Sequence, residues 1–101
     1  MATKTVIRTE NAPAPFQGAP YSQAIRAGDF VFVSGQLAID PADGKMVEGP
    51  IGGQTERILL NIKAILEAAG SSLDNLVKTS VFLADLADFA AMNEAYAKYV
   101  G

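Results

Sequence analysis

Apolar residues in the first half of the chain occur in short runs typical of β-strands. These runs cover residues 5–8, 24–27 and 30–36. Ala27-Gly28-Asp29 fits the tight turn of a hairpin between the second and third runs. The third run begins with four apolar residues (FVFV), which predicts a strand buried on both faces. The sequence therefore predicts three strands near the N-terminus.

The second half of the chain changes to a helical spacing. Apolar residues recur on one helix face over residues 52–69, and Gly70 follows where a left-handed C-cap is expected. A strand pattern returns at residues 77–83. A second helix is expected over residues 86–100, with Asp85 as its N-cap.

The expected order is β-β-β-α-β-α in one α+β domain over residues 1–101. A right-handed crossover through the first helix makes strands 30–36 and 77–83 parallel in a mixed sheet. Both helices then pack on one face of that sheet. A pattern of this kind usually adds a strand after the last helix, so we expect the domain to be C-terminally incomplete, with its last strands missing. The proline-rich residues 11–20 predict an ordered loop.

Composition excludes several kinds of chemistry. The chain contains neither histidine nor cysteine, which excludes imidazole and thiolate metal sites and Ser-His-Asp catalysis. Eight basic and 11 acidic residues give a net charge of −3, without the basic face of a nucleic-acid-binding protein. The longest apolar run is too short to cross a bilayer, and no signal peptide is recognisable. We expect a cytoplasmic protein that binds neither metal, nucleic acid nor membrane.

Ser34 and Gly35 end the third predicted strand. A glycine inside a strand is typical of a bulge or of close approach by a ligand, and a serine hydroxyl beside an open N–H suits an anion or a carbonyl group. Spacing alone slightly favours the bulge. Both interpretations remain open at this point.

Two further polar residues are candidates for ligand binding. Tyr21 follows a stiff Gly-Ala-Pro segment and could donate a hydrogen bond to a substrate, although such a ring more often packs on a sheet edge. Asn93 shares a helical stripe with Phe89, Tyr96 and Val100, which predicts that it lies in or beside a buried face. Its amide would then satisfy a nearby loop or orient a ligand.

Short motifs along the whole chain resemble those of the RidA/YjgF family of reactive intermediate deaminases. No single motif is diagnostic, but the ordered set is specific. It consists of NAP at 11–13, GAPYSQA at 18–24, VSGQ at 33–36, NIK at 61–63, EAAG at 67–70 and VKTSVFL at 77–83, followed by Asn93 and Tyr96.

The resemblance implies a chorismate-mutase-like fold and a homotrimer with clefts between subunits. Family members hydrolyse 2-imino acids, such as 2-iminobutanoate and 2-iminopropanoate, to 2-oxo acids and ammonia without a cofactor. By position, Tyr21 and Ser34 would be catalytic. Gly35 would bind the substrate carboxylate together with Ser34, and Asn93 would line the cleft from a neighbouring subunit.

Two further functional groups of the family have no counterpart among these positions. They are an arginine that clamps the substrate carboxylate and a glutamate that holds the attacking water, both in strands expected after Gly101. The 101 residues alone are therefore expected to be inactive. A non-catalytic binding or regulatory module on the same scaffold is the main alternative. An endoribonuclease or translation inhibitor is the alternative that net charge supports least.

Overall fold

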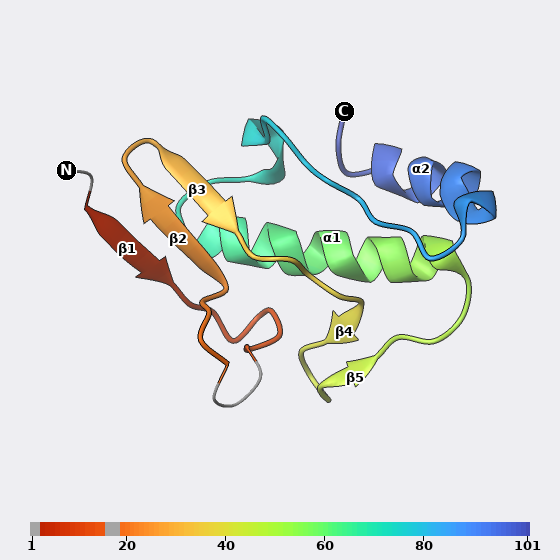
Figure 1. Cartoon of the computed structure of the whole chain (residues 1–101), viewed down its shortest axis with the longest axis horizontal. Coiled ribbons are helices and arrows are strands. Elements are labelled where there is room, and N and C mark those ends of the chain that lie inside the picture. Colours follow the sequence, from red (N-terminus) through yellow and green to blue (C-terminus); the bar gives the residue numbers. More distant parts are fainter. Residues whose placement is uncertain (1–2, 16–18) are drawn as a thin grey trace.

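The computed structural model describes residues 3–15 and 19–101, and Figure 1 shows a mixed α+β fold. Three antiparallel strands form a sheet in the order β1-β2-β3, and two very short strands form a second hairpin. The elements are β1 (Lys4–Ile7), β2 (Ala24–Ala27), β3 (Phe30–Val33), β4 (Ile39–Asp40), β5 (Lys45–Met46), α1 (Ile51–Ala68) and α2 (Phe89–Ala97), with 3-10 turns η1 (Leu73–Asn75) and η2 (Leu86–Asp88). The predicted fold class is confirmed.

The β2–β3 hairpin forms where the sequence predicts it. Ala27 pairs with Phe30, so the loop contains only Gly28 and Asp29. Gly28 has a φ of +60°, and a glycine with positive φ at the first loop position is typical of a type II′ turn. The strand is shorter than predicted, because it ends at Val33 and residues 34–36 lie outside the ladder.

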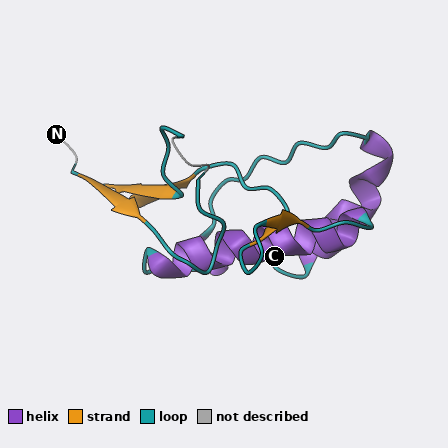
Figure 2. Ribbon diagram, turned by 90° about the horizontal axis from the view of Figure 1, so that it is seen from below, coloured by secondary structure: helices purple, strands orange, loops and turns teal. Residues whose placement is uncertain are grey.

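The prediction that β3 is buried on both faces is wrong. Val31 and Val33 pack against the core, whereas Phe30 and Phe32 are 59% and 62% exposed. Side chains alternate between the two faces of a strand, and the sheet has α1 on one side (Figure 2). The two phenylalanine rings lie on the other face, with centroids 6.3 Å apart.

The hydrophobic core lies between the sheet and the C-terminal half of α1. Its buried members are Ile7, Ala12, Ala24, Ile65 and Ala69. Ile7 and Ala24 are paired across β1 and β2, and Ile65 is completely buried on the helix side. Burial of one such isoleucine contributes roughly 1.5–3 kcal/mol. This end of α1 is therefore fixed to the sheet by packing.

The first helix agrees with its predicted limits to within one residue. It ends in a Schellman motif, in which the Gly70 N–H donates to the Glu67 carbonyl and the Ser71 N–H donates to the Leu66 carbonyl. Gly70 has a φ of +80°, the left-handed conformation that this motif requires. The predicted C-cap is thus confirmed.

The strand predicted at residues 77–83 does not form. The segment runs between η1 and η2 without a ladder partner among the described residues, and Val77 and Phe82 are almost fully exposed. A strand pattern specifies an extended backbone, but a strand exists only when a neighbour completes its hydrogen bonds. The expected parallel pairing with β3 is therefore absent from the described residues.

The second helix is shorter than the predicted residues 86–100. The turn η2 precedes it, and the Asp85 side chain accepts a hydrogen bond of 2.9 Å from the Ala87 N–H, as expected of an N-cap. The helix packs along the N-terminal half of α1, at the end away from the sheet (Figure 1). The expectation that both helices pack on one face of the sheet therefore holds for α1 and is wrong for α2. Of the predicted loop at residues 11–20, residues 16–18 lie outside the described residues. No described helix meets the length and hydropathy needed to span a membrane.

Candidate functional site

The side chain of Gln23 organises the segment that carries Tyr21. Gln23 is 4% exposed, and its Oε1 accepts a hydrogen bond of 2.7 Å from the Thr9 N–H. Its Nε2 donates to the carbonyls of Thr9, Ala12 and Pro13 at 3.0, 3.2 and 2.9 Å. One buried amide thus joins the start of β2 to the chain that follows β1. Sequence reasoning did not single out Gln23, although it lies inside the GAPYSQA motif.

Ser34 attaches the end of β3 to the same segment. Its N–H donates to the Gln23 carbonyl at 3.0 Å, and its Oγ donates to the Ser22 carbonyl at 2.6 Å. The β2–β3 register explains this contact, because Ala24 pairs with Val33 and the next residues outward are Gln23 and Ser34. Ser34 therefore lies beside the residue that follows Tyr21.

Gly35 presents an open backbone next to Ser34. It is exposed, and no heavy atom lies within 4 Å of the position that a Cβ would occupy. Among the described residues, nothing accepts a hydrogen bond from its N–H. The hydroxyl hydrogen of Ser34 is held by Ser22, so the free donor here is the Gly35 N–H and the free acceptor is Ser34 Oγ.

Tyr21 lies in the wall of a pocket of about 490 Å³. Ser22 and Gln23 line the same pocket, together with Arg8 and Thr9 from the segment after β1. The Tyr21 side chain is 45% exposed, and its hydroxyl makes no hydrogen bond within the described residues. The phenol is thus accessible to a ligand, and Ser22 connects it to Ser34.

Asn93 was predicted to lie in or beside a buried face, and it does not lie in one. Asn93 is exposed, and the buried residues of α2 are Met92 and Ala95. The helix is rotated relative to the predicted stripe because contact with α1 determines which face is buried. Since α2 lies at the opposite end of α1 from the sheet (Figure 1), Asn93 does not join Tyr21, Ser34 and Gly35 within one chain.

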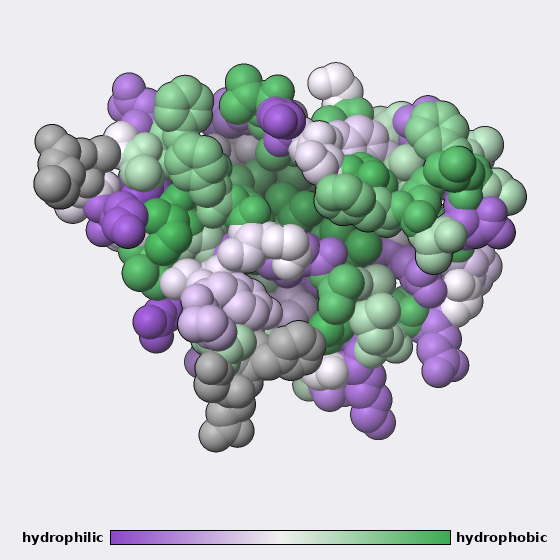
Figure 3. All heavy atoms as spheres, in the orientation of Figure 1, coloured by the Kyte–Doolittle hydropathy of each residue, from purple (hydrophilic) through white to green (hydrophobic). Residues whose placement is uncertain are grey.

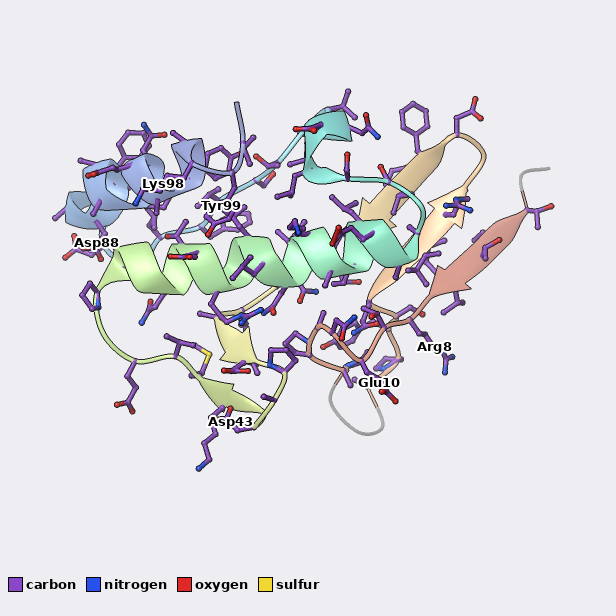
Figure 4. The ribbon with its side chains drawn as sticks, turned by 180° about the vertical axis from the view of Figure 1, so that it is seen from behind. Arg8, Glu10, Asp43, Asp88, Lys98 and Tyr99 are labelled. Carbon is purple, nitrogen blue, oxygen red and sulfur yellow. The ribbon has the colours of Figure 1, made fainter. Side chains whose placement is uncertain are left out.

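Two side-chain hydrogen bonds hold α2 in place. The Tyr99 hydroxyl donates to Glu56 Oε1 at 2.6 Å, and the Tyr96 hydroxyl lies 2.6 Å from Thr79 Oγ1. Figure 4 shows Tyr99 between α2 and α1. The hydrogen bond to Glu56 raises the pKa of Tyr99, and some loss of solvation and the negative charge of Glu56 act in the same direction.

A buried asparagine fixes the chain that follows Gly35. Asn61 in α1 is completely buried, and its Nδ2 donates to the carbonyls of Leu37 and Ile39 at 3.2 and 2.9 Å. Sequence reasoning noted Asn61 only as part of the NIK motif. An asparagine on the apolar side of a helix is the signal that could have identified this contact.

The described residues contain no group of three or more acidic side chains arranged to hold a metal ion. The site is thus composed of hydroxyl groups, one open N–H and a nearby pocket. Such an arrangement can bind an anion, position a water molecule and exchange hydrogen bonds with a polar substrate.

Comparison with known proteins identifies the relatives of this chain. The family model described as Endoribonuclease L-PSP matches residues 9–101. A RutC family protein of Pyrococcus horikoshii is 58% identical, over 97% of this chain and 76% of the relative. The chloroplastic Reactive Intermediate Deaminase A of Arabidopsis thaliana is 50% identical, over 95% of this chain and 50% of the relative.

Solved structures agree with the sequence comparison. The crystal structure of a putative endoribonuclease of Thermotoga maritima superposes with a TM-score of 0.92 at 46% identity, covering 96% of this chain and 75% of that one. RidA from an Antarctic Psychrobacter gives a TM-score of 0.89 at 44% identity, covering 96% and 76%. The chain therefore belongs to the Endoribonuclease L-PSP family, in which its relatives include RidA proteins, as the ordered motifs predicted.

Proposed function

We propose that the protein hydrolyses reactive 2-imino acids, such as 2-iminobutanoate and 2-iminopropanoate, to 2-oxo acids and ammonia. The observation that carries this proposal is the open Gly35 N–H beside the acceptor oxygen of Ser34, next to the segment of the exposed Tyr21. The printed name of the Arabidopsis relative supports the reaction class.

The reaction is an addition of water followed by elimination of ammonia. The water oxygen forms a bond to the imine carbon, the electron pair of the C=N bond moves to nitrogen, and nitrogen takes the proton that the water loses. In the resulting carbinolamine the hydroxyl proton is transferred to the amine, the C–N bond breaks to release ammonia, and the C=O bond forms. The chemistry therefore requires a bound carboxylate, a positioned water molecule and proton transfer. No oxidation or reduction takes place.

Gly35, Ser34 and Tyr21 each have a role in this scheme. The Gly35 N–H donates to a substrate carboxylate oxygen. Ser34 Oγ accepts a hydrogen bond from the imine N–H or from the water, because its own hydrogen is directed to Ser22. The Tyr21 hydroxyl donates to the developing amine or oxyanion.

A homotrimer with clefts between subunits would complete this arrangement. Asn93 is exposed at the far end of α1 from Tyr21, so it is free to contribute to the cleft of a neighbouring subunit. The exposed faces of Phe30 and Phe32 are apolar area that an assembly would cover. The family resemblance also implies a carboxylate-binding arginine and a water-holding glutamate, and we expect activity only where both are present.

The test is a coupled assay in which a threonine dehydratase generates 2-iminobutanoate. We expect a protein that carries this arginine and this glutamate to accelerate both loss of the imine and release of ammonia. Tyr21→Phe and Ser34→Ala should each lower this rate by about tenfold or more, whereas Ser80→Ala, an exposed serine in residues 77–83, should not change it. Circular dichroism checks that each variant is folded.

The same experiment separates the alternatives. An unchanged imine lifetime would contradict the deaminase proposal, and saturable binding of 2-oxobutanoate in that case would favour a non-catalytic binding module. Equal rates for Ser34→Ala and Ser80→Ala would show that the residue assignments are wrong. The word endoribonuclease in the family description predicts RNA cleavage, which we do not expect from a chain of net charge −3.

A further inference from the structure

A second pocket, of about 460 Å³, lies between α1 and the segment that follows β1. Figure 4 shows this segment alongside the C-terminal half of α1. Thr9 and Asn11 form one wall, and Arg57 and Lys63 contribute from the helix. None of Tyr21, Ser34, Gly35 and Asn93 lines this pocket, so it is distinct from the site proposed above.

The unpaired charge in this pocket belongs to Arg57. Lys63 Nζ lies 3.5 Å from Glu67 Oε1, so these two lining charges offset each other. Within the described residues, no carboxylate lies within 4.0 Å of the Arg57 guanidinium and no hydrogen bond engages it. Its Nε is buried without a partner. A half-buried guanidinium without an acceptor is a favourable partner for an anion.

The opposite wall is rigid and carries a free donor. The Thr9 N–H and carbonyl are both bonded to the Gln23 amide. Thr9 Oγ1 accepts a hydrogen bond of 3.1 Å from the Asn11 N–H, which leaves the hydroxyl hydrogen free to donate. The Thr9 hydroxyl is therefore held in a fixed position at the pocket.

The remaining lining residues favour one class of anion. Leu60 and Ala64 provide apolar surface between the polar walls. The planar guanidinium fork matches the two oxygens of a carboxylate, and the apolar surface between the walls favours an organic anion over phosphate. A pocket of this volume accommodates a small organic molecule.

We propose that this pocket binds a small monocarboxylate with a short apolar chain. The Arg57 guanidinium holds the carboxylate oxygens, the Thr9 hydroxyl donates a further hydrogen bond, and Leu60 and Ala64 contact the carbon chain. The proposal does not depend on imine hydrolysis, because the ligand need not react.

The experiment is a titration of the ¹⁵N-labelled protein with sodium butanoate at constant ionic strength, followed by NMR. Butanoate has no 2-oxo or 2-imino group and so does not mimic the proposed reaction centre. We expect saturable shifts of the Asn11 and Leu60 amides, which belong to this pocket alone, whereas Thr9 lines both pockets. Arg57→Gln should weaken binding by about tenfold, whereas Arg26→Gln, which removes an exposed arginine of β2, should leave the affinity unchanged.

Two additional variants keep the test decisive if Arg57→Gln does not fold. Arg57→Lys retains the charge but loses the fork, and it should weaken binding severalfold. Thr9→Val removes the free hydroxyl while keeping the backbone bonds to Gln23, and it should weaken binding about threefold. Equal affinity in the Arg57 and Arg26 variants, shifts that do not saturate, or tighter binding of phosphate than of butanoate would each overturn the proposal.

Discussion

The two ends of α1 are held by different kinds of interaction. At the sheet end, the helix packs on the buried cluster around Ile65, and the buried Gln23 amide makes four hydrogen bonds nearby. At the α2 end, Met92 and Ala95 are buried beside α1, but the two connecting hydrogen bonds are exposed and Phe82 faces solvent. Figure 3 shows green, hydrophobic side chains at the surface around that end.

This difference predicts unequal local stability. Buried contacts exclude water and are lost only when the sheet separates from the helix, whereas exposed hydrogen bonds exchange readily with solvent. The residues proposed to bind substrate within one chain lie at the stable end. Asn93 lies at the weaker end, where contact with another subunit would contribute most.

The largest contrast is expected from truncating one buried side chain at each end. Ile65→Ala removes a completely buried side chain from the main cluster and should lower the free energy of unfolding by roughly 3–4 kcal/mol. Met92→Ala, between α2 and α1, should cost about 2 kcal/mol, because fewer buried groups surround it. Urea unfolding of both variants measures the contrast, and a larger cost for Met92→Ala would reverse the ranking of the two ends.

Removal of the Gln23 amide should lower the free energy of unfolding by somewhat less than Ile65→Ala does. Gln23→Leu has a similar size but leaves the polar backbone groups of Thr9, Ala12 and Pro13 without their partners. We expect a loss of about 2–3 kcal/mol, since each buried group left unsatisfied carries a penalty. Gln54→Leu, whose two hydrogen bonds are both 3.4 Å long, is the matched control and should cost less than about 1 kcal/mol. Equal losses would show that the Gln23 amide does not organise the segment.

The smallest effect on the free energy of unfolding should come from loss of the hydrogen bond between Tyr99 and Glu56, and this effect should depend on pH. The pKa of Tyr99 is raised in the folded state. The Tyr99–Glu56 hydrogen bond therefore contributes fully to the free energy of unfolding below the unfolded pKa of about 10, and this contribution is lost as pH rises through the folded pKa. Ultraviolet titration of the phenol should show a lower pKa in Glu56→Gln than in the unchanged protein. An identical titration in both proteins would contradict the contact.

Local signals predicted part of the fold well. Positive φ at Gly28 and Gly70 corresponds to the expected turn and helix end, and the regular apolar spacing of α1 defined its limits. The segment at 77–83 was wrongly predicted as a strand because pairing depends on a neighbour, which no local pattern supplies. Asn93 was misplaced because α2 contains several small alanines, so its apolar stripe is weakly defined.

In the candidate site, too, local features could be predicted from the sequence, whereas contacts between distant segments could not. Ser34 and Gly35 stood out because they interrupt a strand pattern, whereas their position beside Ser22 follows from the β2–β3 register. Gln23 and Arg57 were not identified as important, since their roles arise from segments distant in sequence. Whether Tyr21, Ser34, Gly35 and Asn93 act on a substrate stays a prediction.

Thr9 gives the two pockets a common wall. It lines both of them, and Gln23 holds its N–H and carbonyl from only two positions beyond Tyr21. A ligand that displaced Thr9 in one pocket would therefore alter a wall of the other pocket. Because such a coupling would be a single free energy, a ligand in the second pocket would change the affinity of the first by the same factor. A metabolite bound beside Arg57 would thus act as a modulator of substrate binding near Tyr21, without occupying that site.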